Sequence, residues 1–124
     1  MTSWAYPTHT PGKLCSKSDP DYAEVRYQEK IPYCRRHVTH HMKATVAKLY
    51  GVPEKDWKLY EFDHLLPLSI GGANSIDNLW PQILIEAKEK DKTEEAAYIC
   101  MKESKCTQKQ AIKMIWDWFK GEKK

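Results

Sequence analysis

The sequence lacks several features that would assign its class directly. Its 124 residues contain no apolar run close to the roughly 20 residues that span a bilayer, so we expect no membrane-spanning helix. No two of its four cysteines are spaced as Cys-x-x-Cys, which removes the usual spacing of a zinc ribbon. We also find no internal repeat, linker or low-complexity tract. The chain is therefore expected to form one domain, 1–124, with a modest core.

Charge of one sign is not in strong excess either. Twenty Lys and Arg residues against seventeen Asp and Glu residues give a formal net charge of +3. This mild excess is compatible with a polyanionic partner such as nucleic acid but does not require one. No zinc finger, homeodomain or other base-reading module is recognisable. Any contacts with nucleic acid would therefore be made mainly to phosphate.

The cysteines fall into one pair near each end of the chain. The simplest pairing joins Cys15 to Cys34 and Cys100 to Cys106, and the alternative is four reduced, buried thiols. Bridged cysteines would make the protein secreted or periplasmic, and reduced ones would make it cytoplasmic. The start at 1–4 shows no signal peptide, so it is either a mature end behind an added Met or a cytoplasmic start. Export is therefore a hypothesis at this point.

The most informative stretch runs from Leu59 to Gln82. Period-two alternation predicts a strand that sends Phe62 and His64 to one side and Asp63 to the other. A turn composition containing Gly71 and Gly72 follows, and Asn78-Leu79-Trp80 returns as a short second strand. Pro81 lacks an amide donor, so we expect strand pairing to stop there. A helix from about Ile83 to Met101 completes a strand, loop, strand and helix unit over about 57–103.

The flanking segments are simpler. Residues 1–33 hold four prolines and little periodicity, so we expect them to wrap the domain as extended or turning chain. Apolar residues at helical spacing predict a helix over about 34–50, which Gly51 and Pro53 end. A last helix over about 107–120 should begin at Thr107 as N-cap and bury one apolar stripe. The predicted fold class is α+β.

This pattern resembles the ββα-metal (His-Me finger) HNH endonucleases, in particular a branch of small bacterial and phage HNH-like proteins. The residues that carry the likeness are Asp63-His64, Gly71-Gly72, Asn78-Leu79-Trp80-Pro81 and the Lys90-Asp91 pair. Two upstream segments, 19–22 and 29–35, also look like that branch. The resemblance implies a ββα-metal core with additional packing helices, and a divalent-metal-dependent endonuclease. Its substrate would be DNA, with RNA as an alternative, cleaved with little sequence preference.

The resemblance also implies roles for individual residues. His64 would be the general base that takes a proton from water, since a neutral imidazole suits that task near pH 7. Asp63 would hold a divalent cation, Mg²⁺ first with Mn²⁺ or Zn²⁺ as alternatives, which would stabilise the departing oxygen. Asn78 would fix the loop and orient the histidine. Glu61 would act electrostatically beside Asp63. An Asp-His pair without this context would more often be a buried structural pair.

The helix departs from the family pattern because it carries neither the histidine nor the asparagine that usually completes the metal site. We take Glu86 as the replacement ligand, with Glu89 as a rival. Lys90, one turn after Glu86, would then point at a phosphate. The alternative for Glu86 and Lys90 is an exposed ion pair.

Basic residues gather before and along the helix predicted over 34–50. Arg35 and Arg36 would either grip phosphate or form ordinary surface ion pairs. His37 and His41, one turn apart in that helix, have a spacing that can hold zinc, although a solvated or capping role is the simpler interpretation. We expect a monomer without a membrane partner, and the sequence does not identify an inhibitor protein. The alternatives to an enzyme are a catalytically degenerate, HNH-like nucleic-acid-binding protein and an exported interaction protein.

Overall fold

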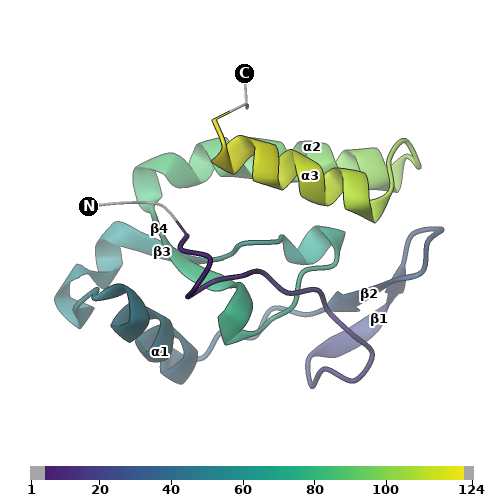
Figure 1. Cartoon of the computed structure of the whole chain (residues 1–124). Coiled ribbons are helices and arrows are strands. Elements are labelled where there is room, and N and C mark those ends of the chain that lie inside the picture. The colour runs from purple at the N-terminus through teal and green to yellow at the C-terminus, as the bar shows by residue number, and fades with distance from the viewer. Residues whose placement is uncertain (1–4, 122–124) are drawn as a thin grey trace.

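The computed structural model describes residues 5–121 and has an α+β architecture (Figure 1). Two small antiparallel sheets, each of two strands, combine with three α-helices and three short 3₁₀ turns in this part of the chain. One sheet pairs β1 (Tyr22–Arg26) with β2 (Ile31–Cys34). The other pairs β3 (Tyr60–His64) with β4 (Leu79–Ile83) and lies between the helices.

The predicted strand, loop, strand and helix unit is confirmed. β3 pairs with β4 in a register that places Asp63 opposite Trp80 and His64 opposite Leu79. The helix α2 (Leu84–Lys102) begins directly after β4, close to the predicted 83–101. Opposed residues of an antiparallel pair share a face, so Asp63 lies on the Trp80 face and His64 on the Leu79 face.

One prediction about this hairpin is wrong. Pairing does not stop at Pro81, because β4 continues to Ile83 and Phe62 pairs with Pro81. Only alternate residues of an antiparallel strand direct their N–H groups at the partner. Pro81 occupies a position whose missing N–H would point away from β3, so the proline costs the ladder no hydrogen bond.

The two faces of the β3–β4 hairpin pack against different helices. On one face Trp80 joins the larger core cluster with residues of α2 and of α3 (Gln108–Phe119), including Met101, Ile115 and Phe119. On the other face Phe62 and Leu79 pack against Val46 and Ala47 of α1 (His40–Tyr50). In Figure 1 the hairpin accordingly lies between α1 below and the α2–α3 layer above.

The helix ends follow local sequence signals. Thr107 caps α3 as predicted, and its side chain and that of Gln110 form a reciprocal capping box. The helix α1 begins at His40, six residues later than the predicted start at 34, with the Thr39 side chain accepting from Met42 N. The segment 35–39 is irregular, so Arg35 and Arg36 precede the helix, and His37 is not one helical turn from His41.

Within the segment 1–33, predicted as extended or turning chain, residues 22–34 form a β-hairpin, which sequence reasoning does not identify as paired strands. Pro32 lies in β2 opposite Val25, and a two-stranded sheet has only edge strands, where proline is tolerated. The segment before it does wrap: Gly12 N donates to Asp77 O, Cys15 N to Gly71 O, and Ala73 N to Lys13 O. Residues 1–4, for which the sequence allows a mature or a cytoplasmic start, lie outside the described residues.

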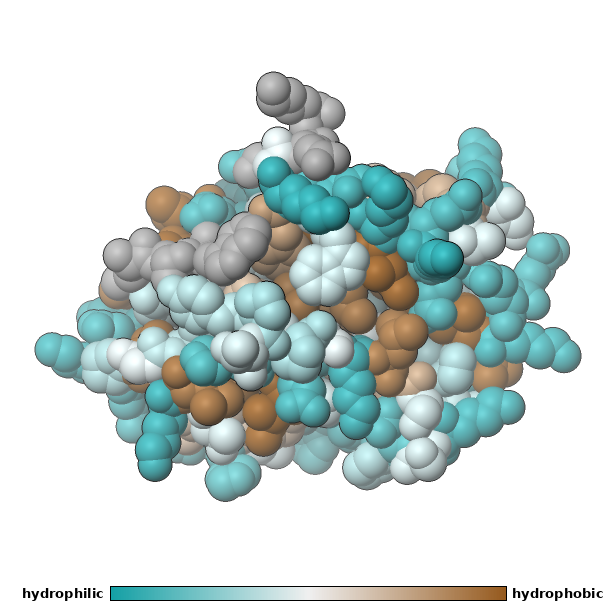
Figure 2. Space-filling view, viewed as in Figure 1, coloured by the Kyte–Doolittle hydropathy of each residue, from teal (hydrophilic) through white to brown (hydrophobic). Residues whose placement is uncertain are grey.

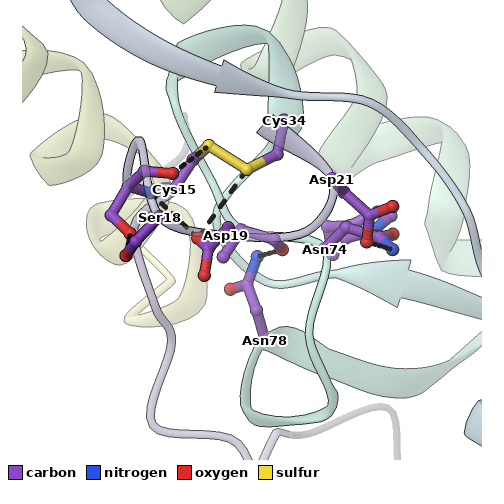
Figure 3. Close-up of a disulfide and its surroundings, with 10 residues drawn as sticks. Cys15, Ser18, Asp19, Asp21, Cys34, Asn74 and Asn78 are labelled. Carbon is purple, nitrogen blue, oxygen red and sulfur yellow. Dashed lines mark hydrogen bonds between the residues drawn. A yellow bond between two sulfur atoms is a disulfide. The ribbon is translucent and has the colours of Figure 1, made fainter. Parts of the chain in front are cut away.

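Both predicted disulfides are confirmed. Cys15 bonds to Cys34 and Cys100 to Cys106, with Cα–Cα distances of 5.7 and 5.5 Å. The first bridge joins the N-terminal segment to the end of β2 (Figure 3). The second closes the turn between α2 and α3.

Hydrophilic residues cover much of the visible surface (Figure 2). Figure 2 shows hydrophilic residues over the outer surface of the α2–α3 layer and hydrophobic residues gathered below α3. Among the described residues, no helix combines the length and apolar character that crossing a membrane requires.

Candidate active site

His64 and Asp63 leave the end of β3 in opposite directions, as the alternation predicts. His64 is only 4 % exposed, whereas the Asp63 side chain keeps 15 % of its surface exposed. His64 faces the 71–78 loop and the chain before α1, and Asp63 faces α2. The two side chains therefore belong to two neighbouring but separate polar clusters.

The first cluster fixes the orientation of the His64 ring. His64 Nε2 lies 2.9 Å from Asn74 Oδ1. The Asn74 amide is itself held on both sides, because its Nδ2 donates to Asp21 Oδ2 at 3.0 Å and to His37 O at 2.8 Å, and its Oδ1 accepts from His37 N at 3.2 Å. Figure 3 shows Asp21 and Asn74 side by side.

These contacts determine the tautomer of the imidazole. A carboxylate and a carbonyl only accept hydrogen bonds, so Asn74 must direct its NH₂ group at them and its oxygen at His64. His64 Nε2 therefore carries the proton and donates it to Asn74. The other ring nitrogen, Nδ1, is then unprotonated and carries the basic lone pair.

Arg36 lies beside Nδ1. Its Nη1 is 3.4 Å from His64 Nδ1, and Arg36 as a whole is exposed. Burial is the main cause that lowers the pKa of His64 below its ordinary value of 6.5, and the Arg36 charge adds to this. The imidazole is thus neutral at physiological pH, with its basic nitrogen beside an exposed guanidinium.

Asn78 holds the backbone that follows His64. The residue is fully buried, and its Nδ2 donates to Leu66 O at 3.0 Å and to Ala73 O at 2.8 Å. Its Oδ1 accepts from Leu66 N at 3.0 Å, and its backbone O accepts from Leu65 N at 2.7 Å. Asn78 is therefore placed to fix the loop, whereas the direct partner of the His64 ring is Asn74.

The second cluster surrounds Lys90. Lys90 Nζ donates to Asp63 Oδ2 at 2.9 Å, to His64 O at 3.1 Å, and to Glu94 Oε2. The Lys90 side chain is completely buried. Two sequence-based expectations are therefore wrong: Lys90 does not point at a phosphate in solution, and it is not part of an exposed ion pair with Glu86. The helix α2 packs this position against β3, and the acidic partners keep the buried ammonium charged.

The acidic side chains near Lys90 outnumber the cation. Burial is the main cause that raises the pKa of Glu94, to about 7, even though Lys90 opposes the shift. Glu61, on the Asp63 face of β3, also has a raised pKa, through partial burial and then the charges of Asp63 and Asp91. This part of the site is thus a negatively charged patch around one ammonium group, and Glu61 contributes to its field.

The side chains present do not fit the divalent cation that the resemblance implies. Among the described residues, the only group of three His, Cys, Asp or Glu side chains whose ligand atoms lie within 4.8 Å of one another is Cys15, Asp19 and Cys34. The two sulfurs of that group form a disulfide and are not thiolate ligands. Within the same part of the chain, Asp63 shares no such group with any of the predicted ligands, Glu86, Glu89, His37 and His41. Asp63 Oδ2 accepts from Lys90 instead.

Three residues of the site are not identified by sequence reasoning. Asn74 is predicted only as part of a turn, because an asparagine after two glycines is a common turn signal. Asp21 lies in a segment that carries the resemblance, but nothing in one sequence shows that it contacts residue 74, fifty-three positions away. Glu94 has a local signal, since it follows Lys90 by one helical turn.

Comparisons of the chain with family models, with curated proteins and with solved structures find no match. The interpretation of the site therefore stands on the geometry above and on the resemblance of its motifs.

Proposed function

We propose that the protein is an endonuclease that hydrolyses phosphodiester bonds in DNA or RNA, with His64 as the general base. The observation that carries the proposal is the hydrogen-bonded chain from Asp21 through Asn74 to His64. A base that is held by an orienting group, neutral at working pH and placed beside an anion-binding cation is the arrangement that hydrolysis of a phosphate ester needs. A buried ring with only a structural role would also need a hydrogen-bond partner, but it would not need the exposed guanidinium beside its second nitrogen.

Arg36 supplies the binding site for the phosphate in this proposal. Its guanidinium can turn from His64 Nδ1 onto two phosphate oxygens, because the side chain is exposed and its fork matches a phosphate. This movement also uncovers the Nδ1 lone pair. The phosphate and the base would then face each other across a single water molecule.

The proposed chemical step is a direct displacement at phosphorus. The water oxygen forms a bond to phosphorus while its proton passes to His64 Nδ1, and the bond from phosphorus to the 3′ oxygen breaks. The leaving oxygen takes a proton from solvent. As the resemblance implies, the products would carry 5′-phosphate and 3′-hydroxyl ends.

Binding along the substrate would depend on exposed basic residues around Arg36. Arg35, His37 and His40 are all exposed on the same part of the chain. Their contacts would be to phosphates, which predicts binding with little base preference and a strong dependence on salt.

A cleavage assay on single-stranded DNA, duplex DNA and RNA tests the proposal. We expect His64→Ala to lower cleavage by at least about 100-fold while binding at low salt persists, since removal of a general base affects chemistry more than affinity. Arg36→Ala should weaken binding and cleavage together. His41→Ala, which removes an exposed histidine from α1, is the matched control and should change cleavage little.

Asn74→Ala separates a positioning role from simple loss of structure. Without the acceptor at Nε2 the ring can adopt either tautomer, so the pH profile of cleavage should change along with its rate. Equal cleavage by wild type and His64→Ala would contradict the proposal.

The second candidate is a nucleic-acid-binding protein without catalysis. The observation in its favour is that His64 is only 4 % exposed, with Arg36 over its basic nitrogen. It predicts salt-dependent binding through Arg35 and Arg36 with no cleavage under any condition tested. The two disulfides support the further proposal that either protein acts in an oxidising compartment.

A further inference from the structure

The Lys90 ammonium uses all of its hydrogen-bonding capacity inside the protein. An ammonium group has three protons, and Nζ has three acceptors: Asp63 Oδ2, His64 O and Glu94 Oε2. The side chain reaches these atoms from the middle of α2, and none of its surface is exposed. No donor is left over for a substrate phosphate.

The three acceptors have the chemistry of a hard-cation site. Two carboxylate oxygens and one backbone carbonyl oxygen converge on a single point, which is the ligand type that Mg²⁺, Mn²⁺ and Ca²⁺ bind. They come from β3 and α2, two elements that pack directly on each other. The point on which they converge is filled by the side chain of Lys90.

The charge at this point also favours a permanent cation. Two carboxylate oxygens, Asp63 Oδ2 and Glu94 Oε2, accept directly from the buried Nζ. They offset the cost of burying the ammonium charge. A second cation beside it would meet direct repulsion in a buried environment.

We propose that the Lys90 ammonium is the resident cation of the Asp63 site and takes the place of the divalent metal that the motif resemblance implies. The protein thus folds and binds its substrate without a divalent cation, and Lys90 is a positioning residue that holds the backbone of His64. A second consequence, cleavage that survives removal of divalent metal, rests on the proposed function.

Binding of divalent cations tests the inference without any enzymatic readout. Purified protein treated with a chelator and then dialysed is titrated with Mg²⁺ and with Mn²⁺, followed by calorimetry and by the melting temperature. We expect wild type to show no saturable binding and no change in melting temperature. Saturable binding that Asp63→Asn abolishes would overturn the inference.

Removal of the lysine gives the complementary test. Lys90→Ala leaves Asp63, Glu94 and the His64 carbonyl facing an open space, and breaking a buried ion pair should lower the melting temperature by about 10–20 °C. Millimolar Mn²⁺ should then restore part of the loss, and this rescue should disappear in Lys90→Ala combined with Asp63→Asn. An unchanged melting temperature, or a loss that Mn²⁺ leaves as it is, would contradict the inference.

Two further variants keep this test decisive. Lys88→Ala removes an exposed lysine from the same helix and should neither destabilise the protein nor create metal binding. If Lys90→Ala does not fold, Lys90→Met keeps most of the aliphatic stem and leaves two carboxylates without their cation. It should then be less stable than wild type and respond to Mn²⁺, and a variant as stable as wild type would contradict the proposal.

The cleavage assay separates this inference from the proposed function. Cleavage by wild type in excess chelator supports both, and cleavage that strictly requires a divalent cation overturns the cation inference alone. If wild type cleaves nothing with or without metal, the proposed function fails. The calorimetric and melting results then still decide whether Lys90 is the resident cation.

Discussion

At the scale of single residues, His64 is buried, and its hydrogen bond to Asn74 places the proton of the neutral ring on Nε2. Because burial lowers its pKa below 6.5, the unfolded chain binds more protons than the folded protein in the window just below pH 6.5. The contribution of His64 to stability is therefore complete above pH 6.5 and is lost as the pH falls through the folded value. Acidification should weaken the fold at this position.

Glu94 has the opposite effect on stability. Its pKa is about 7 in the folded protein against an ordinary 4.5, so the folded state holds the extra proton between these values. The contribution of Glu94 to stability falls as the pH rises through that window. The free energy of unfolding of wild type, measured against pH, would therefore contain both contributions and could not separate His64 from Glu94.

Comparison of wild type with His64→Gln isolates the histidine. As the pH falls below about 6.5, wild type should lose stability relative to the variant, and this difference reports the protonation of His64 alone. Urea unfolding midpoints across about pH 5 to 8 provide the measurement. Parallel curves for the two proteins would show that His64 has the same pKa folded and unfolded.

Sequence reasoning identifies the Asp63-His64 pair better than its surroundings. The divergence of Asp63 and His64 follows from the alternation of a strand, which is a local rule. The partners of these residues are not local: Asp21 reaches Asn74 across 53 positions, and Lys90 reaches Asp63 across 27. Whether Lys90 faces solvent or a buried carboxylate depends on how α2 packs on β3. The spacing of residues within α2 does not show this packing.

At the scale of elements, the loop between β3 and β4 depends on two glycines with different requirements. Gly71 has φ +103°, a conformation that other residues rarely adopt. The φ of Gly72 is not in this region, but Gly72 has no room for a side chain. A Cβ there would lie 1.8 Å from Leu66 O. The chain approaches itself closely here, and Gly72 N donates to Pro67 O.

Gly72→Ala should therefore destabilise the protein far more than a typical glycine substitution. Gly51→Ala is the matched control, because Gly51 has φ +69° but no atom lies within 4 Å of the place that a methyl group would take. The substitution should therefore lower the free energy of unfolding by only about 1 kcal/mol. We expect Gly72→Ala to cost about 3 kcal/mol or more, as backbone must move to admit the methyl group. Equal midpoints of the two variants in urea would contradict the close approach.

The element boundaries that sequence reasoning places wrongly have local explanations. Pro81 predicts an interrupted strand, and Pro32 counts toward an extended or turning wrap, yet each lies in a two-stranded sheet where an N–H can point outward without loss. The predicted start of α1 is too early because apolar spacing extends before His40, whereas the cap at Thr39 decides where the helix begins. The helices α2 and α3, which have strong local signals, lie within a residue or two of their predicted bounds.

At the scale of the whole molecule, one disulfide joins the N-terminal segment to β2, and the other closes the turn between α2 and α3. They close loops of 19 and 6 residues in sequence separation. Chain-entropy estimates give about 3 kcal/mol for the Cys15–Cys34 bridge and about 2 kcal/mol for Cys100–Cys106. The first also joins the N-terminal segment to the strand that leads to Arg36.

Thiol counting under denaturing conditions should find no free thiol, and replacement of both Cys15 and Cys34 by serine should cost more stability than replacement of Cys100 and Cys106. The larger loop of the first bridge is the reason. Unfolding in urea, with each double variant compared to wild type, measures the difference. Four free thiols in the native protein would rule out the bridges and with them the proposal of an oxidising compartment.

The position of the Cys15–Cys34 bridge links the order of the candidate site to the oxidation of these two cysteines. Arg36 follows Cys34 by two positions, and Asp21, which orients Asn74, lies between the two bridged cysteines. In a freshly made chain with both sulfurs still reduced, these residues would be held by non-covalent contacts alone. The covalent link between these two parts of the site would then form only when the Cys15–Cys34 bridge is oxidised.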